Sequence, residues 1–199
     1  AADFRRLPVK AGRRQVIAVT GDIYTKNCHL GNRDLVRWLE AHGCETAVNG
    51  MSWYVLYYID THLDVWPRPA RLGGKLLGAH LERLQRGMLD TLRAAGFTAL
   101  PPYRALKAQA AGLAPMSCAL GAGWLMAAEM AGWVRPGRRK VLCCQSFGCL
   151  PGHICARGQY ASLMRKLPGS LIVGVDFDPS TGEGTLESRV RMLLDEELD

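Results

Sequence analysis

The stretch Gln15–Asp22 reads QVIAVTGD, in which a run of β-branched and apolar residues over Gln15–Thr20 ends abruptly at Gly-Asp. Near-continuous apolar runs of this kind, without the polar alternation of a half-exposed strand, are typical of parallel strands buried on both faces. Comparable runs follow at Glu45–Val48, Lys140–Gln145 (KVLCCQ) and Ser170–Asp176 (SLIVGVD), the first of them weaker than the others. These four segments predict the strands of an α/β fold.

Helical periodicity fills the intervals between the predicted strands. Apolar residues recur at spacings of three and four in residues 32–43, 75–95, 124–133, 155–166 and 186–198. We predict an open, mainly parallel sheet of about four strands in the order 2-1-3-4, with helices on both faces and a helical insertion over about residues 60–135. We expect residues 1–199 to form one α/β domain, the carboxy-terminal part of a larger protein because the sequence starts at Ala1 rather than Met.

Composition argues against several classes of protein. Hydrophobic residues make up 48% of the chain, but no apolar run approaches the roughly 20 residues of a membrane span. Much of the net charge of +7 lies in residues 5–14 and 135–140, which lack the interleaved aromatic residues that stack on bases, so nucleic-acid binding is not expected. Seven cysteines, an odd number, without a recognisable signal peptide predict a reducing, cytoplasmic location.

Two loops are the candidates for a functional role, because ligands of open α/β sheets bind beyond the carboxyl ends of the strands where strand order reverses. They are Gly21–Gly31 (GDIYTKNCHLG) after the first strand and Ser146–His153 (SFGCLPGH) after the third. The residues predicted to line this crevice are Gly21, Asp22, Tyr24, Asn27, Phe147, Gly148, His153, Asp176 and Asp178. For the two aspartates an equal alternative is that one caps the following turn through Ser180 or Thr181.

The candidate metal ligands are Cys149, on a turn between Gly and Leu-Pro, and Cys28 on the other loop. Cys143 and Cys144 lie within a strand and are expected in the core. The sequence has no C-x2-C pair of the kind that binds structural zinc. It also contains neither a phosphate-binding loop nor a complete dinucleotide-binding fingerprint. An alternative is a nucleophilic Cys149 assisted by His153 and Asp176.

Three segments together resemble the carboxy-terminal region of the large activators of 2-hydroxyacyl-CoA (2-hydroxyglutaryl-CoA) dehydratases, which are related to dehydratase subunits and double-cubane cluster proteins. They are Gly121–Met130 (GAGWLMAAEM), Gln145–Gly158 (QSFGCLPGHICARG) and Asp176–Leu194 (DFDPSTGEGTLESRVRMLL). The loop Gly21–Asn32 is similar to the GEIY…N…N loop of the same region. This chain departs from the family at Asp22 and Ala122, where glutamate is usual, and at Cys28, where cysteine is not.

The resemblance implies that Cys149 is a ligand of an iron–sulfur cluster whose other ligands lie upstream of Ala1. It implies a domain that serves ATP-coupled, low-potential electron transfer in the intact protein. The implied partners are the upstream ATPase and cluster-binding domains and a 2-hydroxyacyl-CoA dehydratase-like protein. We expect the isolated chain to be folded, inactive and free of the cluster, with Cys149 at least half-exposed. A non-catalytic docking domain and a cysteine-nucleophile enzyme remain the alternatives.

Overall fold

The computed structural model describes residues 2–8, 12, 14–180 and 182–196. The chain divides into two compact units. One combines residues 14–48 with residues 107–199 and contains the sheet; the other combines residues 1–13 with residues 49–106 and is helical where described. The helical insertion expected over about residues 60–135 is thus shared between the two units.

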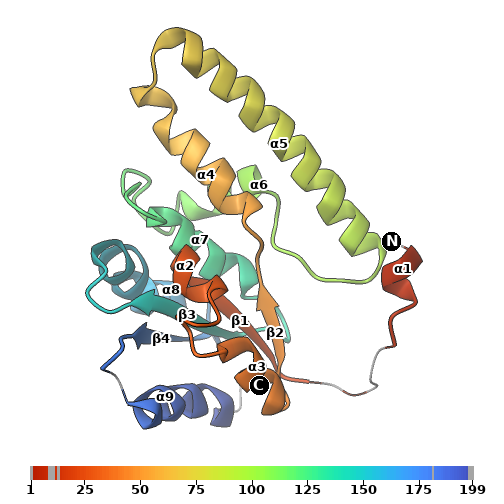
Figure 1. Cartoon of the computed structure of the whole chain (residues 1–199), viewed down its shortest axis with the longest axis vertical. Coiled ribbons are helices and arrows are strands. Elements are labelled where there is room, and N and C mark those ends of the chain that lie inside the picture. Colours follow the sequence, from red (N-terminus) through yellow and green to blue (C-terminus); the bar gives the residue numbers. More distant parts are fainter. Residues whose placement is uncertain (1, 9–11, 13, 181, 197–199) are drawn as a thin grey trace. The chain divides into compact units, whose positions relative to one another are not determined.

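Four strands form one open, all-parallel sheet (Figure 1). They are β1 (Val16–Gly21), β2 (Glu45–Val48), β3 (Lys140–Ser146) and β4 (Leu171–Phe177). Their order, β2-β1-β3-β4, confirms the predicted order 2-1-3-4, and every strand begins and ends within one residue of the predicted bounds. The apolar runs located the strands well because the central strands are buried on both faces.

Helices cover both faces of this sheet, as predicted (Figure 1). On one face α3 (Leu35–Ala41) and α9 (Glu183–Asp195) complete an apolar core with side chains of β1, β3 and β4. On the other face lie α7 (Gly123–Trp133) and α8 (Tyr160–Lys166). Tyr160 packs so closely on β4 that a Cβ added at Gly174 would meet its ring and hydroxyl. The two faces differ: the first has an apolar core with buried Lys140 at its edge, donating to the Leu194 carbonyl (3.1 Å), and the second includes several buried polar groups.

The segment after β3 differs from the single helix predicted over residues 155–166. It forms a π-helical turn over Gly152–Ala156, a 3-10 turn over Arg157–Gln159 and then α8. Close packing of Gly152 on Gln145, where an added Cβ would lie 3.2 Å from the Gln145 Cβ, accompanies this irregular start. A further helix, α2 (Ile23–Asn27), follows β1; its five residues are too few to produce a helical hydrophobic period.

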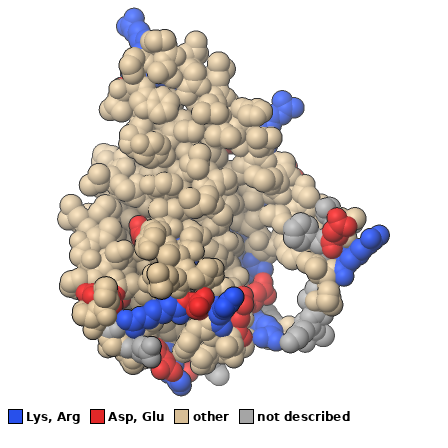
Figure 2. Space-filling model, viewed as in Figure 1, with Lys and Arg blue, Asp and Glu red and all other residues tan. Residues whose placement is uncertain are grey.

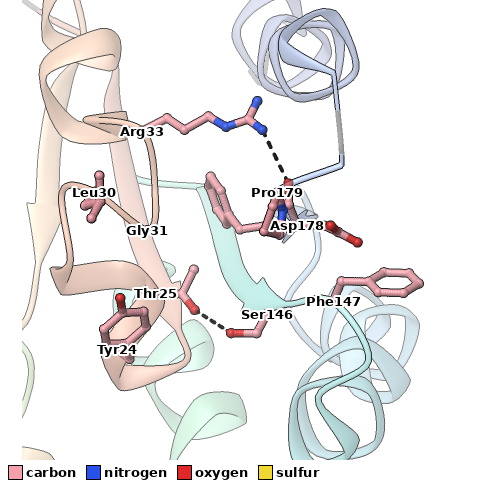
Figure 3. A pocket seen from close by; sticks show the side chains of 10 residues that line it. Tyr24, Thr25, Leu30, Gly31, Arg33, Ser146, Phe147, Asp178 and Pro179 are labelled. Atoms are coloured by element: carbon pink, nitrogen blue, oxygen red, sulfur yellow. Dashed lines mark hydrogen bonds between the residues drawn. The ribbon is translucent and has the colours of Figure 1, made fainter.

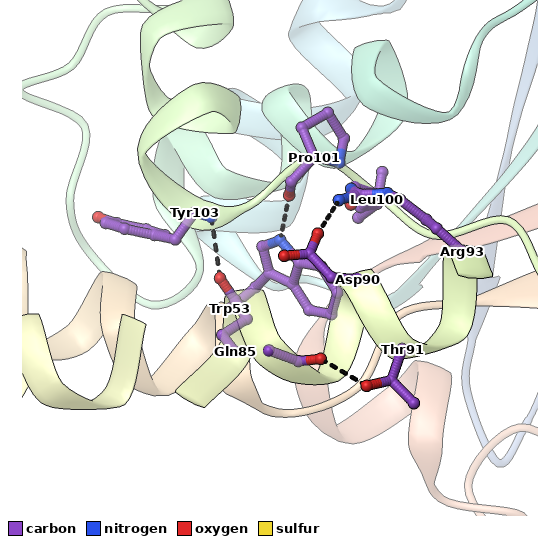
Figure 4. Close-up of polar contacts among 9 residues, drawn as sticks. Trp53, Gln85, Asp90, Thr91, Arg93, Leu100, Pro101 and Tyr103 are labelled. Atoms are coloured by element: carbon purple, nitrogen blue, oxygen red, sulfur yellow. Dashed lines mark hydrogen bonds and ion pairs between the residues drawn. The ribbon is translucent and has the colours of Figure 1, made fainter. Parts of the chain in front are cut away.

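In the helical unit, α1 (Ala2–Arg5) comes first and α4 (Ser52–His62) is joined by the 3-10 turn Leu63–Val65 to the long helix α5 (Arg68–Ala94). Helix α6 (Tyr103–Ala110) begins in this unit. The Gln85 side chain links three elements, donating to Ser52 Oγ (3.0 Å) and accepting from the Tyr103 backbone N–H (2.9 Å; Figure 4). No helix in the described ranges is long and apolar enough to cross a bilayer.

In the view of Figure 2 most charged side chains lie toward the lower end, and the upper part shows only isolated basic groups. Those at the lower end, where α3 and α9 lie in Figure 1, include both acidic and basic groups side by side. A nucleic-acid groove would need a continuous basic surface, and the described residues visible in this view do not form one.

Candidate functional site

The loops after β1 and β3 meet at the carboxyl edge of the sheet. The Asp22 N–H donates to the Cys144 carbonyl (2.8 Å), and Gly21 has φ of +110°. A Cβ at position 21 would collide with the Cys144 carbonyl oxygen, so glycine is needed for this close approach. From β1 and β3 the chain continues to strands on opposite sides, to β2 and to β4. The two loops thus adjoin at the topological switch point.

Side-chain hydrogen bonds hold the first loop against the second. Asp22 caps α2: its Oδ1 accepts from the Thr25 backbone N–H (2.8 Å) and from the Thr25 hydroxyl (2.9 Å). The Thr25 hydroxyl also lies 3.1 Å from the Ser146 hydroxyl. Because the single hydroxyl proton of Thr25 is used toward Asp22, Ser146 is the donor in this contact.

A pocket of about 590 Å³ opens between these loops (Figure 3). Five residues that follow β1 line it, together with the last residues of β3 and β4 and the residues just beyond them: Tyr24, Thr25, Leu30, Gly31, Arg33, Ser146, Phe147, Phe177, Asp178 and Pro179. The Arg33 guanidinium reaches across its rim, where Nη2 donates to the Asp178 carbonyl (3.3 Å; Figure 3). Arg33 and Asp34 both have φ of +54°, an unfavourable conformation for residues with a Cβ.

Buried Asn32 stabilises this strained turn. Its amide nitrogen donates to the Thr25 carbonyl (2.9 Å), and its side-chain oxygen accepts from the Leu35 N–H (3.3 Å). Asn32 is thus tied both to α2 and to the start of α3. The sequence pattern predicted a helix from residue 32, whereas the helix begins at Leu35 with Asp34 as its N-cap.

Only some of the predicted crevice residues line the pocket. Tyr24, Phe147 and Asp178 line the pocket, whereas Asn27 is exposed and donates to the Ile23 carbonyl of its own helix (2.8 Å). Gly148 lies in the exposed turn after β3 with φ of +73°.

Asp178 combines the two roles weighed for it. Its carboxylate accepts from the Ser180 N–H (2.7 Å) and hydroxyl (2.9 Å), which is the turn-capping alternative, and these hydrogen bonds lower the pKa of Asp178. The other residue named for that cap, Thr181, lies outside the described residues.

A second polar group surrounds Asp176 on the face covered by α7 and α8. Gln145 Nε2 donates to Asp176 Oδ1 (2.5 Å), and Arg157 Nη2 donates to Asp176 Oδ2 (2.7 Å). His153 Nδ1 lies 3.4 Å from Gln145 Nε2. The Gln145 amide therefore stands where a Cys149–His153–Asp176 triad would need a direct contact between His153 and Asp176.

Cys149 is partly exposed on the turn after β3, and two further cysteines lie nearby. The thiols of Cys118 and Cys155 are neighbours, and Cys149 is close enough to Cys155 to influence its ionisation. Burial, followed by the neighbouring Cys118, raises the pKa of Cys155 to about 11. The turn before α7 contributes to this arrangement, since an added Cβ at Gly121 would lie 3.2 Å from Pro151. Cys118, Cys149 and Cys155 are called the thiol group below.

A buried acceptor lies beside this group. Gln145 is fully buried, and its Oε1 has no hydrogen-bond partner among the described residues. A Cβ placed at Gly152 would lie 3.2 Å from that oxygen and 3.6 Å from the Cβ of Cys149. Gly152 thus packs closely between this acceptor and the cysteine turn, where a side chain would crowd Gln145.

Cys28 belongs to a separate environment. Its sulfur accepts from the Gly31 N–H (3.4 Å), and the Tyr24 hydroxyl also hydrogen-bonds to it. The Tyr24 contact, then the N–H groups of Gly31 and Leu30, lower the pKa of Cys28. The two cysteines predicted as ligands are therefore in different groups: Cys28 contacts its own loop, and Cys149 neighbours Cys155.

The other cysteines are in the core, as predicted for Cys143 and Cys144. Cys143 and Cys144 are fully buried in β3, and Cys44 is buried at the start of β2. Burial raises the pKa of Cys143 to about 11 and that of Cys144 well above its ordinary value. These thiols are enclosed in the core of the sheet and are not accessible to a metal ion.

Sequence reasoning missed several residues of the site. They are Thr25, Arg33, Gln145, Ser146, Arg157 and Cys118. Ser146 and Gln145 end a strand at the crevice edge, so their position in the sequence was an available signal. Cys118 lies in the sequence 31 residues before Cys149, and nothing local indicates their proximity.

The thiol group fits an iron–sulfur cluster in part. Three thiols and an orphan acceptor lie together, but no set of three or more His, Cys, Asp or Glu side chains in the described ranges is arranged to hold a metal ion. Such clusters are commonly held by four thiolates, so the thiol group would need both rearrangement and a further ligand. Comparison of the chain with family models, with curated proteins and with solved structures found no match.

Proposed function

We propose that this chain is an α/β domain that supplies Cys149 as a thiolate ligand to an iron–sulfur cluster and so takes part in low-potential electron transfer. The observation that carries the proposal is the position of Cys149: it is partly exposed, it follows a central strand at the switch point, and it neighbours the free thiol of Cys155. The resemblance to dehydratase activators supports it, because the FGCLP motif of that family contains this cysteine.

Each residue near the cluster would have its own role. Cys149 is accessible and needs the least movement to bind iron; Cys118 and Cys155 are the next thiols in reach. Cys155, with its pKa of about 11, must lose a proton on ligation, so its recruitment is favoured at higher pH. Gln145, which packs against Gly152 behind the cysteine turn, would form part of the wall of the cluster site. When bound, the cluster supplies one-electron redox chemistry.

The proposal includes the partners that the resemblance implies. A fourth thiolate would come from another cysteine-bearing domain, with an ATPase driving electrons toward a 2-hydroxyacyl-CoA dehydratase-like acceptor. All seven cysteines of the chain are free, which suits the reducing conditions of the cytoplasm.

The experiment compares two single variants of the protein that contains this chain. After anaerobic reconstitution with ferrous iron and sulfide, iron and acid-labile sulfide per chain are measured together with the electron paramagnetic resonance spectrum of the reduced state. Cys149→Ser should lose most of the iron and the signal, whereas Cys28→Ser should retain both. Retention by Cys149→Ser, or no iron in any form, would contradict the proposal and favour a docking domain.

A second function, cysteine-based nucleophilic catalysis, is favoured by one observation at a different position from the one predicted. Cys28 receives hydrogen bonds that stabilise its thiolate, and its neighbours Tyr24 and Gly31 line the pocket. Rapid, selective alkylation of Cys28 near neutral pH with unchanged iron content in Cys28→Ser would separate this function from the first.

A further inference from the structure

The long helix α5 carries an apolar face that the structure leaves uncovered. Leu77, Leu84 and Met88 continue the spacing that predicts a buried helix face, yet they are 49%, 51% and 55% exposed. The helix buries a different face, which includes Glu82, Gln85 and Leu89. A long apolar stripe of this kind on a helix is typical of a helix–helix interface.

A glycine interrupts this face. Gly87 is exposed and lies between Leu84 and Met88 in the sequence. No described atom lies within 4 Å of the position that its Cβ would occupy. Glycine inside a helix costs about 1 kcal/mol relative to alanine, and no contact with the described residues requires it. A groove of about 660 Å³ runs along this part of the helix beside Leu84 and Met88. The absence of a side chain at Gly87 therefore leaves open space in which a residue of another helix can pack close to the backbone.

We propose that the occupant of this groove is a second copy of the chain, whose α5 packs antiparallel to the first and inserts Leu84 over the partner's Gly87. The two-fold symmetry of such a pair also places the partner's Leu84 over Gly87. In heptad terms, Leu84 of one helix and Gly87 of the other are the core positions that face each other. On one side of this core, Met88 then lies beside the partner's Leu81. Two helical hairpins joined in this way form a four-helix bundle.

Charge complementarity selects this register. On the other side of the contact between the two α5 helices, the heptad pairing places Arg83 beside the partner's Asp90. The two-fold symmetry repeats this contact, so it occurs twice. Arg83 is exposed, and the Asp90 side chain is 74% exposed, although it already contacts Arg93 at 3.3 Å on its own helix. Sliding the pair by one heptad, so that Leu84 faces the partner's His80, would instead bring Arg83 against the partner's Arg83.

The apolar seam is long enough for such an interface. It runs from Leu76, 65% exposed, to Phe97 just beyond the end of α5, 41% exposed. At 1.5 Å per residue this is roughly 30 Å. In the proposed register Leu76 and the partner's Phe97 come together at each end, so the exposed apolar groups at both ends are also covered.

The test measures the mass of the full chain in solution by light scattering after gel filtration, over a range of concentrations. The wild type should have twice the 21.8 kDa of one chain. Leu84→Glu should be a monomer, because the charge would be placed in the seam. Gly87→Leu should also be a monomer while its melting temperature is unchanged or higher, since leucine favours the helix but fills the gap. This pair of readouts separates lost docking from lost folding.

Charge reversal tests the register itself. Arg83→Glu should weaken the dimer at least about tenfold, because a carboxylate would then face the partner's Asp90, and the double change Arg83→Glu with Asp90→Arg should restore it. Lys75→Glu is the control: nine residues from Leu84, it lies on the opposite side of the helix and should leave the dimer intact. A wild-type chain that stays monomeric at all concentrations would overturn the proposal. So would a dimer that Leu84→Glu and Gly87→Leu leave unchanged, or one that the double reversal fails to restore.

Discussion

Lys26 Nζ lies 2.7 Å from Glu129 Oε2, and the two side chains are only 1% and 2% exposed. The pair joins the short helix after β1 to the middle of α7, two elements about a hundred residues apart in the sequence. Its position next to the candidate site means that the first crevice loop is anchored through a buried charge contact. Buried ion pairs of this kind are costly to break from one side, because the remaining charge cannot be hydrated.

Lys26→Met should therefore lower the free energy of unfolding by about 3–5 kcal/mol, because Glu129 would be left buried without this partner. The double variant Lys26→Met with Glu129→Leu should be distinctly more stable than the single variant, since both charges are gone. Urea unfolding followed by circular dichroism measures both. Arg191→Met is the control: it breaks the exposed pair with Glu187, whose side chains are 58% and 40% exposed, and should cost at most about 1 kcal/mol.

Gly21→Ala should disrupt the junction of β1 and β3, because the new methyl group collides with the Cys144 carbonyl oxygen in a backbone conformation that disfavours any side chain. We expect a loss of more than about 2 kcal/mol in unfolding free energy. Gly43→Ala is the matched control: Gly43 also has positive φ, +82°, but open space surrounds it, so it should lose only about 1 kcal/mol. Equal losses would show that the contact with β3 is unimportant.

Cys28 should react with iodoacetamide at a lower pH than an ordinary thiol, because the Tyr24 hydroxyl and the N–H groups of Gly31 and Leu30 stabilise its thiolate and lower its pKa. Tyr24→Phe removes the largest of these contributions and should shift the pH profile of alkylation at Cys28 upward. Mass spectrometry of labelled peptides identifies the site at each pH. An unchanged profile in Tyr24→Phe would show that this hydroxyl does not stabilise the thiolate.

Stability should fall as the pH rises from about 9 to about 11. Cys143 and Cys155 both have a pKa of about 11 in the folded chain, above the ordinary value of 9.0. In this window the folded state retains protons that the unfolded state has lost, so raising the pH favours unfolding. Melting temperatures from about pH 8 to about pH 11 measure the effect. Cys155→Ala should give a shallower decline than the wild type, and an identical decline would contradict the role given to this thiol.

Much of the sheet could be predicted from the sequence because burial on both faces leaves a local signature. The runs around Val16–Gly21 and Lys140–Ser146 are apolar residue after residue, and their bounds and order were confirmed. The same reasoning placed Cys143 and Cys144 in the core and anticipated the turn capped by Asp178. These features depend on neighbours within a few residues, or on the average polarity of a segment.

The site depended on contacts that no local pattern records. Cys118 meets Cys155 because the turn before α7 packs against the turn after β3, and the Thr25 hydroxyl meets that of Ser146 because Gly21 lets two strands approach. The Gln145 amide lies between His153 and Asp176 through strand register and an irregular helix start. Short-range hydrophobic patterns determine which segments are strands and helices, because burial acts on each residue. Which side chains face one another was decided only by tertiary packing. Polar groups from distant segments can form hydrogen bonds and ion pairs only after folding has brought those segments together.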